Sequence, residues 1–458
     1  TGWEYAVSDG TVAGTHALDI EVPGRPSGLA IVGPRLIFVS SDIVEGTELW
    51  SWSSLTNTTS RIEVNPFTGS SPANLMTDGT TAIFSANDSE HGIETWISDG
   101  TSAGTRLVAD SNAVPQSSSP DSFFTLNGEM YFRAIEFEHG RELWKTDGTS
   151  AGTVLVKDIN PGVNSSDSGL VGQVGNIAYF TATTTLNGNE LWMTDGTAIG
   201  TRMIKDINTN INSLRNVEIS YFYADQNGLF FKAYDGTTRD LWTSDGTSAG
   251  TRKIDIRAGS DEDFDYGTVA GTKFYFRSRD DLVNNTGQAL YVADRDSGVV
   301  TKLMTMTGVG NEYPYDIRAV GNSVVFAMYN APSPDGSWQY WMSNGTTAGT
   351  RPFDTAPNDK SYVQSIYRFG NNVAYRFDDG VHGNEWRVFN GTTGVSTLID
   401  LNPYGSANIA SEFVDGNTLR FRADDGVHGD EWWVSDGTIA GTRMYSDVNT
   451  TGAPSSPD

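Results

Sequence analysis

The sequence predicts an all-β protein, a β-propeller of about nine to ten four-stranded blades. A glycine-rich phrase recurs along the whole chain at intervals of 44–50 residues, and in most copies it follows two short apolar runs that flank a tight turn. Repeats of this length with four short strands are typical of propeller blades, in which each sheet packs on two neighbours. Two smaller propellers in tandem are the alternative, because most propellers have four to eight blades.

The recurring phrase is centred on Asp-Gly-Thr or Asn-Gly-Thr. Its strong copies begin at Asp9, Asp99, Asp147, Asp195, Asp245, Asn344, Asn390 and Asp436. Two weaker copies, around Trp50 and Tyr291, fill the gaps between them. One unit is therefore a first hairpin, a connection, and a second hairpin that turns at this phrase. The first hairpin is indicated by turns such as Asn127-Gly128, because both residues tolerate the positive φ of a primed turn.

A tryptophan stands three residues before the Asp or Asn in most strong copies. The tryptophans concerned are Trp96, Trp144, Trp192, Trp242, Trp341 and Trp433, whereas the first copy has Ala6 and the ninth has Arg387. We interpret the tryptophan as a large ring wedged between adjacent blades. Trp52, Trp338 and Trp432 fall outside this position.

The residue types of the turn indicate a structural role rather than a catalytic or ligand-binding one. Its aspartate, which is Asp99, Asp147, Asp195, Asp245 or Asp436 in the clearest copies, can accept a backbone N–H two residues on. A phosphate-binding glycine loop would need a following helix, whereas here a strand follows. A nucleophilic threonine would hardly be needed ten times. We therefore expect the phrase to hold the fold together.

The domain organisation follows from the count of units. Residues 1–22 supply a half-blade hairpin, residues 23–449 form nine four-stranded repeat units in one propeller-like domain, and residues 450–458 form a flexible tail. We expect the hairpin to pack between the last and first complete units. Because the chain starts in the middle of a repeat, we expect it to be a processed or trimmed product.

Composition excludes several classes of function. The chain has 57 acidic and 30 basic residues and a formal charge of -27, which repels nucleic acid and anionic lipid. It contains no cysteine, so disulfides, thiolate metal sites and a cysteine nucleophile are excluded. No apolar run is long enough to insert into a membrane.

The phrase ELWKTDGTSAGTVLVKDINPG, from Glu142, resembles the ELWxxDGT (hyalin-like) repeat of large bacterial secreted proteins. The stretch from Ala423, ADDGVHGDEWWVSDGTIAGT, is similar to the extended form of that repeat. The resemblance implies a protein that is extracellular or at the cell surface, often beside adhesive modules.

Acidic glycine-containing loops are the candidates for a metal site. Carboxylate and carbonyl oxygens are the ligands that Ca²⁺ prefers. The candidate calcium ligands are Asp88, Glu90, Asp378, Asp379, Asp424 and Asp425. The alternative for these loops, and for the acidic run from Gly259, is an ordinary solvated loop. Four histidines, His91, His139, His382 and His428, lie in the same connections, where we expect them to tie the loop down by hydrogen bonds.

The sequence therefore favours an extracellular ligand-binding or adhesion module with structural calcium, and no catalytic residues are assigned. Its expected partner is a glycan or protein ligand at the cell surface or matrix, with self-association as a further option. The alternatives are a structural subunit of a surface layer, filament or appendage, and a secreted enzyme acting on polysaccharide. The enzyme would need a defined pair of carboxyl groups, which the sequence does not single out.

Overall fold

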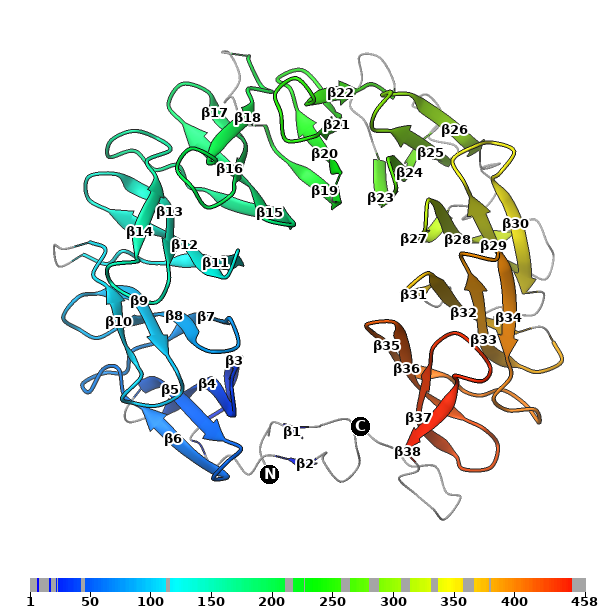
Figure 1. Cartoon of the computed structure of the whole chain (residues 1–458), viewed down its shortest axis with the longest axis horizontal. Coiled ribbons are helices and arrows are strands. Elements are labelled where there is room, and N and C mark those ends of the chain that lie inside the picture. Colours follow the sequence, from blue (N-terminus) through cyan, green and yellow to red (C-terminus); the bar gives the residue numbers. More distant parts are fainter. Residues whose placement is uncertain are drawn as a thin grey trace.

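The computed structural model describes residues 6–7, 16–17, 22, 24–42, 46–112, 116–210, 217–225, 227–256, 264–279, 288–305, 314–330, 337–356, 366–378 and 380–446. These residues form nine four-stranded antiparallel sheets and one short hairpin, and they contain no helix. The prediction of an all-β fold built from four-stranded units is confirmed. Figure 1 shows the nine sheets along one arc around a common central space.

Each sheet consists of four strands that follow one another in the chain. The first three sheets contain β3 (Ser27–Val32), β4 (Arg35–Asp42), β5 (Gly46–Ser53) and β6 (Thr58–Ile62); β7 (Ala73–Thr77), β8 (Ala82–Asn87), β9 (Ile93–Ser98) and β10 (Arg106–Ala109); β11 (Asp121–Leu126), β12 (Glu129–Glu136), β13 (Gly140–Thr146) and β14 (Val154–Lys157).

The fourth to sixth sheets contain β15 (Gly169–Val174), β16 (Ile177–Thr184), β17 (Gly188–Thr194) and β18 (Arg202–Lys205); β19 (Ser220–Asp225), β20 (Gly228–Tyr234), β21 (Arg239–Ser244) and β22 (Arg252–Ile254); β23 (Phe264–Ala270), β24 (Lys273–Arg279), β25 (Gln288–Asp294) and β26 (Val300–Thr305).

The last three sheets contain β27 (Pro314–Val320), β28 (Ser323–Asn330), β29 (Ser337–Ser343) and β30 (Arg351–Ala356); β31 (Tyr367–Phe369), β32 (Asn372–Asp378), β33 (Asn384–Asn390) and β34 (Val395–Ile399); β35 (Ala410–Asp415), β36 (Thr418–Asp424), β37 (Asp430–Ser435) and β38 (Arg443–Ser446).

The first strand of each sheet is its inner strand, because in Figure 1 these strands border the central space. Tight turns set the register of the hairpins that start there. In the third sheet Leu126 pairs with Glu129 across a two-residue loop, in which Asn127 has φ 54° and Gly128 has φ 79°. This is the conformation that a primed hairpin turn requires, so the Asn-Gly signal identified the turn correctly.

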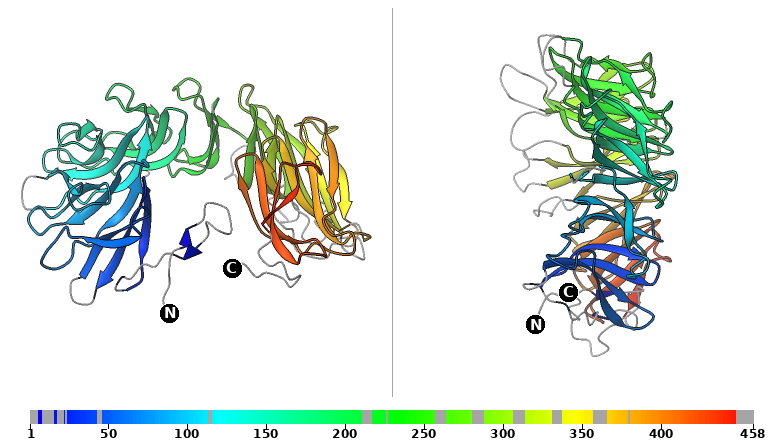
Figure 2. Two further views of the ribbon diagram at one scale, coloured as in Figure 1. Left: turned by 60° about the horizontal axis from the view of Figure 1, so that its bottom comes forward. Right: turned by 90° about the vertical axis from the view of Figure 1, so that its left-hand side faces the viewer.

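The core lies between the sheets rather than within one of them. One cluster joins Leu126, Tyr131 and Leu143 of the third sheet to Phe180 and Trp192 of the fourth. Similar clusters join the other successive sheets, from the first and second to the eighth and ninth. Figure 2 shows the same sheets from two further sides, stacked one after another along the arc. Each sheet therefore depends on its neighbours for burial.

The hairpin predicted within residues 1–22 is only partly described. Strands β1 (Ala6–Val7) and β2 (His16–Ala17) pair in antiparallel fashion, and Figure 1 places them in the gap between the first and ninth sheets. The rest of that hairpin and the tail at 450–458 lie outside the described residues. The half-blade and the flexible tail stay predictions. No described helix is long and apolar enough to cross a membrane.

Candidate functional site

The recurrent tryptophans lie at the contacts between sheets. Trp192 is buried against the preceding sheet, and its ring stacks on Phe180 with ring centres 6.5 Å apart. Trp242 is buried in the cluster shared by the fourth and fifth sheets. The partly buried rings at this position pack on equivalent clusters; they are Trp96, Trp144, Trp341 and Trp433. The structure thus places the tryptophans where a packing role requires them.

The Asp-Gly-Thr turn is closed by its own side chains. Asp147 Oδ1 accepts the backbone N–H of Thr149 at 2.9 Å and the Thr149 hydroxyl at 2.7 Å. The Thr149 hydroxyl oxygen accepts the N–H of Gly152, and the Thr153 hydroxyl donates to the Thr149 carbonyl. The same contacts recur around Asp99, Asp195, Asp245, Asn344 and Asp436. These hydrogen bonds lower the pKa of Asp99, Asp147, Asp195 and Asp245.

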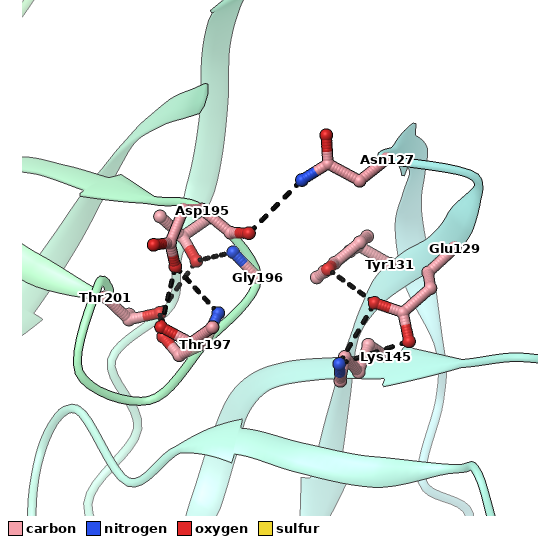
Figure 3. Close-up of polar contacts among 9 residues, drawn as sticks. Asn127, Glu129, Tyr131, Lys145, Asp195, Gly196, Thr197 and Thr201 are labelled. Carbon is pink, nitrogen blue, oxygen red and sulfur yellow. Dashed lines mark hydrogen bonds and ion pairs between the residues drawn. The ribbon is translucent and has the colours of Figure 1, made fainter. Parts of the chain in front are cut away.

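The turn also joins one sheet to the sheet before it. Figure 3 shows Asn127, in the first hairpin turn of the third sheet, donating from Nδ2 to the carbonyl of Asp195 in the fourth at 3.3 Å. Nearby, Lys145 bonds Glu129, which also accepts the Tyr131 hydroxyl. Comparable donors reach the turn carbonyls of other sheets from Arg106, Arg202, Lys273 and Asn372. The repeated phrase therefore connects neighbouring blades.

The last glycine of the turn leaves no room for a side chain. A Cβ on Gly152 would lie 2.0 Å from Asp147 Oδ1, and no such contact is tolerated. We expect Gly152→Ala to lower the free energy of unfolding by about 1–3 kcal/mol, because the Asp147 carboxylate must leave its hydrogen bonds. Denaturant titration measures this loss. Gly405→Ala is the control, because nothing lies within 4 Å of its Cβ position; equal losses in both variants would contradict the steric explanation.

A buried glutamate in the same repeat was missed at the sequence level. Glu142, the first residue of its Glu-Leu-Trp, accepts the backbone N–H groups of Ile159, Asn160 and Ser166 in the loop that leads to the next sheet. Glutamates with the same role are Glu48, Glu94, Glu190 and Glu385. The sequence held a signal for them, since the glutamate recurs two residues before the tryptophan position.

Burial dominates the titration of these glutamates. It raises the pKa of Glu94, Glu142, Glu190 and Glu385 to about 7, against the hydrogen bonds that lower it. A pKa near neutrality is typical of general acids and bases. These carboxylates, however, are buried, and their oxygens accept hydrogen bonds from backbone N–H groups of a loop. Their arrangement fastens successive sheets together.

The predicted calcium ligands lie in loops that close on themselves. Asp88 Oδ1 accepts the N–H groups of Glu90 and His91, and its Oδ2 lies 2.7 Å from Nδ1 of His91. Asp425 holds His428 in the same way. Asp378 and Asp424 each accept the N–H of the glycine two residues on, whereas Glu90 is exposed. Asp379 lies outside the described residues.

No three of the described His, Asp and Glu side chains come together in a way that could hold a metal ion. The calcium site stays a prediction. The histidine prediction agrees with the geometry of His91 and His428, each of which bonds a carboxylate three residues earlier. His139 pairs with Glu136 in the same manner. These carboxylates raise the pKa of His91 and His139.

The inner strands share an irregularity that the sequence did not reveal. Most of their ladders shift register, and the residue at the bulge, Ser122 in β11, has a positive φ. The residues that align with Ser122 form the bulge row, which is Gly28, Asn74, Ser122, Leu170, Tyr221, Tyr266, Asp316 and Ser411. All of them except Leu170 have a positive φ.

The bulge row changes character along the arc. Gly28, Asn74, Ser122 and Ser411 are small, exposed residues. Three successive inner strands, β15, β19 and β23, instead carry Leu170, Tyr221 and Tyr266, which are 43%, 45% and 67% exposed. Within the bulge row, the large, solvent-accessible side chains therefore lie on three successive inner strands.

Comparison with known proteins informs only the fold. No family model matches the chain, and no curated protein does. Among solved structures, the tricorn protease has 14% identity and a TM-score of 0.36, covering 96% of this chain and 45% of its own. Puromycin hydrolase has 14% identity and a TM-score of 0.31, covering 82% and 61%.

The β-propeller domain of the Trilobed protease from Pyrococcus furiosus, whose topology is an open velcro, has 11% identity and a TM-score of 0.29. It covers 74% of this chain and 98% of its own. The present chain thus spans about half the length of the tricorn protease and less than two thirds of the length of puromycin hydrolase.

The prediction of an extracellular ligand-binding or adhesion module is wrong. The solved structures that are similar to this chain are a protease, a hydrolase and the β-propeller domain of a protease, and none of them is an adhesion module by its title. The prediction rested on the repeats and on the acidic loops. The described turns join neighbouring sheets, and the described carboxylates of those loops bond their own backbone or histidine. We therefore do not retain that function or its two alternatives.

Proposed function

We propose that this chain is a propeller domain that binds an extended polypeptide on the inner side of its arc of sheets. The observation that carries the proposal is the row of large, exposed side chains, Leu170, Tyr221 and Tyr266, on three successive inner strands. Exposed apolar and aromatic side chains grouped on one surface mark interaction sites, whereas singly scattered ones need no explanation.

The neighbouring strands support a continuous surface. β15 contacts β19, and β19 contacts β23. The rings of Tyr221 and Phe264 lie 5.9 Å apart across the second of these junctions. A chain that crosses the inner strands would therefore meet the three side chains in succession. The formal charge of -27 favours a neutral or basic polypeptide over an acidic one.

The number of blades and the place of the N-terminal hairpin are part of the same proposal. We propose nine full blades, with the hairpin of residues 1–22 as a half-blade between the first and the ninth. In support, Val22 packs with Phe38 and Trp52 of the first sheet. Phe413 and Trp432 form an edge-to-face pair on the ninth sheet, and Phe413 stays 47% exposed. A hairpin in the gap would cover both faces.

Binding to a permanently unfolded protein tests the proposed function. A reduced and alkylated globular protein, labelled with a fluorophore, should bind, whereas its native form should not. Leu170→Asp should weaken this binding at least about tenfold, because it places a charge in the centre of an apolar contact. Fluorescence anisotropy measures the affinity.

Ile199→Asp is the matched control. Ile199 is 92% exposed and lies in the turn between β17 and β18 of the same sheet. Its substitution adds the same charge away from the inner strand and should leave the affinity unchanged. Absence of binding to the unfolded protein, or equal losses in both variants, would overturn the proposed function.

A further inference from the structure

Two tyrosines occupy backbone conformations that disfavour them. Tyr221 has φ 48° and Tyr266 has φ 43°, at positions where other inner strands place Gly28, Asn74 or Ser122. Glycine reaches positive φ freely and asparagine does so more easily than most residues, but a bulky side chain there is strained. Strain of this kind persists where function needs the residue.

The two rings are held in place and still accessible. The Lys232 ammonium lies 5.9 Å from the ring centre of Tyr221, and the Arg277 guanidinium lies 4.7 Å from that of Tyr266. Each ring therefore has a cation beside it, and Lys232 also lies 5.1 Å from the ring centre of Phe264. Both rings remain about half exposed or more. Two oriented aromatic surfaces on adjacent strands form a ready contact for a ligand.

The backbone around these rings argues against a ligand that adds a β-strand. The bulges lie in β19 between Ser220 and Tyr223, and in β23 between Asp265 and Gly267. A bulge twists an edge and interrupts its row of donors and acceptors. The ligand must therefore be recognised by side chains. A polyproline II helix meets this condition, because it needs no strand partner and docks on aromatic side chains.

We propose that Tyr221 and Tyr266 form a binding site for a proline-rich, basic polypeptide segment. The inference rests on the proposed function and names its ligand class. The tyrosine rings pack on the proline rings, and their hydroxyl groups can donate to the carbonyl groups of the segment. The acidic protein attracts the basic residues that flank the prolines.

The first measurement is the affinity for a labelled oligoproline peptide with lysine at each end. The oligoproline peptide should bind at least about tenfold more tightly than a glycine–serine peptide of equal length and charge. Tyr221→Asn and Tyr266→Asn should each weaken oligoproline binding at least about tenfold. Ser122→Ala, at the same position of the third sheet, should leave it unchanged.

The second measurement is the melting temperature, which does not depend on the peptide. Asparagine fits the backbone at this position, as Asn74 does with φ 57°. The two tyrosine variants should therefore melt no lower than the wild type, because relief of strain offsets the lost ring contacts. The reciprocal Asn74→Tyr variant should melt lower. Tyrosines kept for folding would give the opposite result, a lower melting temperature in the asparagine variants.

The inference is overturned by equal affinity for the two peptides, by unchanged affinity in both tyrosine variants, or by a lower melting temperature in both. After any of these outcomes the proposed function is still supported, provided that the unfolded protein binds and that Leu170→Asp weakens this binding. Conversely, the proposed function fails by itself if the unfolded protein does not bind at all.

Discussion

Replacement of Trp192 by alanine should lower the free energy of unfolding by about 3–5 kcal/mol, as the loss of large buried aromatic side chains does. The indole is 7% exposed and packs between the third and fourth sheets. It also borders a pocket of about 500 Å³ formed with the loop after β14.

Trp432→Ala is the matched control for this substitution. Trp432 lies one residue before the recurrent position, on the ninth sheet, where it is partly buried and contacts Phe413 edge to face. Its loss should cost roughly half as much, because less surface is buried. Urea denaturation, followed by circular dichroism, compares the two variants. A Trp192→Ala protein that unfolds at the wild-type midpoint would show that the ring is not a packing element.

One repeat fills the tryptophan position differently. Arg387 places its guanidinium 4.1 Å from the ring centre of Phe377 and 3.3 Å from a carboxylate oxygen of Asp354, on the preceding sheet. The Tyr375 hydroxyl also donates to Asp354, at 2.8 Å. The arginine therefore still joins two sheets, with a planar charged group in place of an indole. In the nine complete repeats the position therefore holds a flat side chain, which is not always tryptophan.

Local signals explain why the fold could be predicted. Asn127-Gly128 and the Asp-Gly-Thr turns encode their conformations in adjacent residues, so the hairpins and the four-stranded units follow from the sequence. The long-range contacts of the same residues were not readable. Nothing near Glu142 indicates that its carboxylate reaches the loop at Asn160, because that contact depends on the path of the chain around the blade.

The bulge row was missed for a different reason. In a sequence, glycine or asparagine indicates a positive φ, as at Gly28 and Asn74. Tyrosine does not, so the positive φ of Tyr221 and Tyr266 could not be predicted. In the sequence both tyrosines look like ordinary strand residues. Only their positive φ, at the register shifts of β19 and β23, shows the strain. The candidate binding site therefore required the structure, whereas the repeat architecture did not.

The second large effect concerns pH. Burial raises the pKa of Glu94, Glu142, Glu190 and Glu385 from 4.5 to about 7. Between these two values the folded protein binds more protons than the unfolded chain does. Stability is therefore greatest at or below about pH 4.5 and falls as the pH rises through 7. Over this whole range each glutamate should contribute a change of about 3 kcal/mol.

The turn aspartates act in the opposite direction at lower pH. Hydrogen bonds lower the pKa of Asp99, Asp147, Asp195 and Asp245 below the usual 3.8. Their stabilisation is present above 3.8 and is lost as the pH falls through their folded pKa values. The two sets of carboxylates together predict a stability maximum in the mildly acidic range, near pH 4–5 as an order-of-magnitude estimate.

Glu142→Gln isolates one glutamate from the general repulsion of an acidic protein, because glutamine has nearly the same shape and does not titrate. We expect the wild type minus variant difference in unfolding free energy to be larger at pH 5 than at pH 8, by about 2–3 kcal/mol, with half of this change reached at about pH 6 and most of it by about pH 7. The general repulsion largely cancels in this difference. Urea titrations of both proteins across that range measure it. A difference that rises with pH would mean that the donors from Ile159, Asn160 and Ser166 outweigh burial and that the carboxylate anion is the form that secures the next sheet.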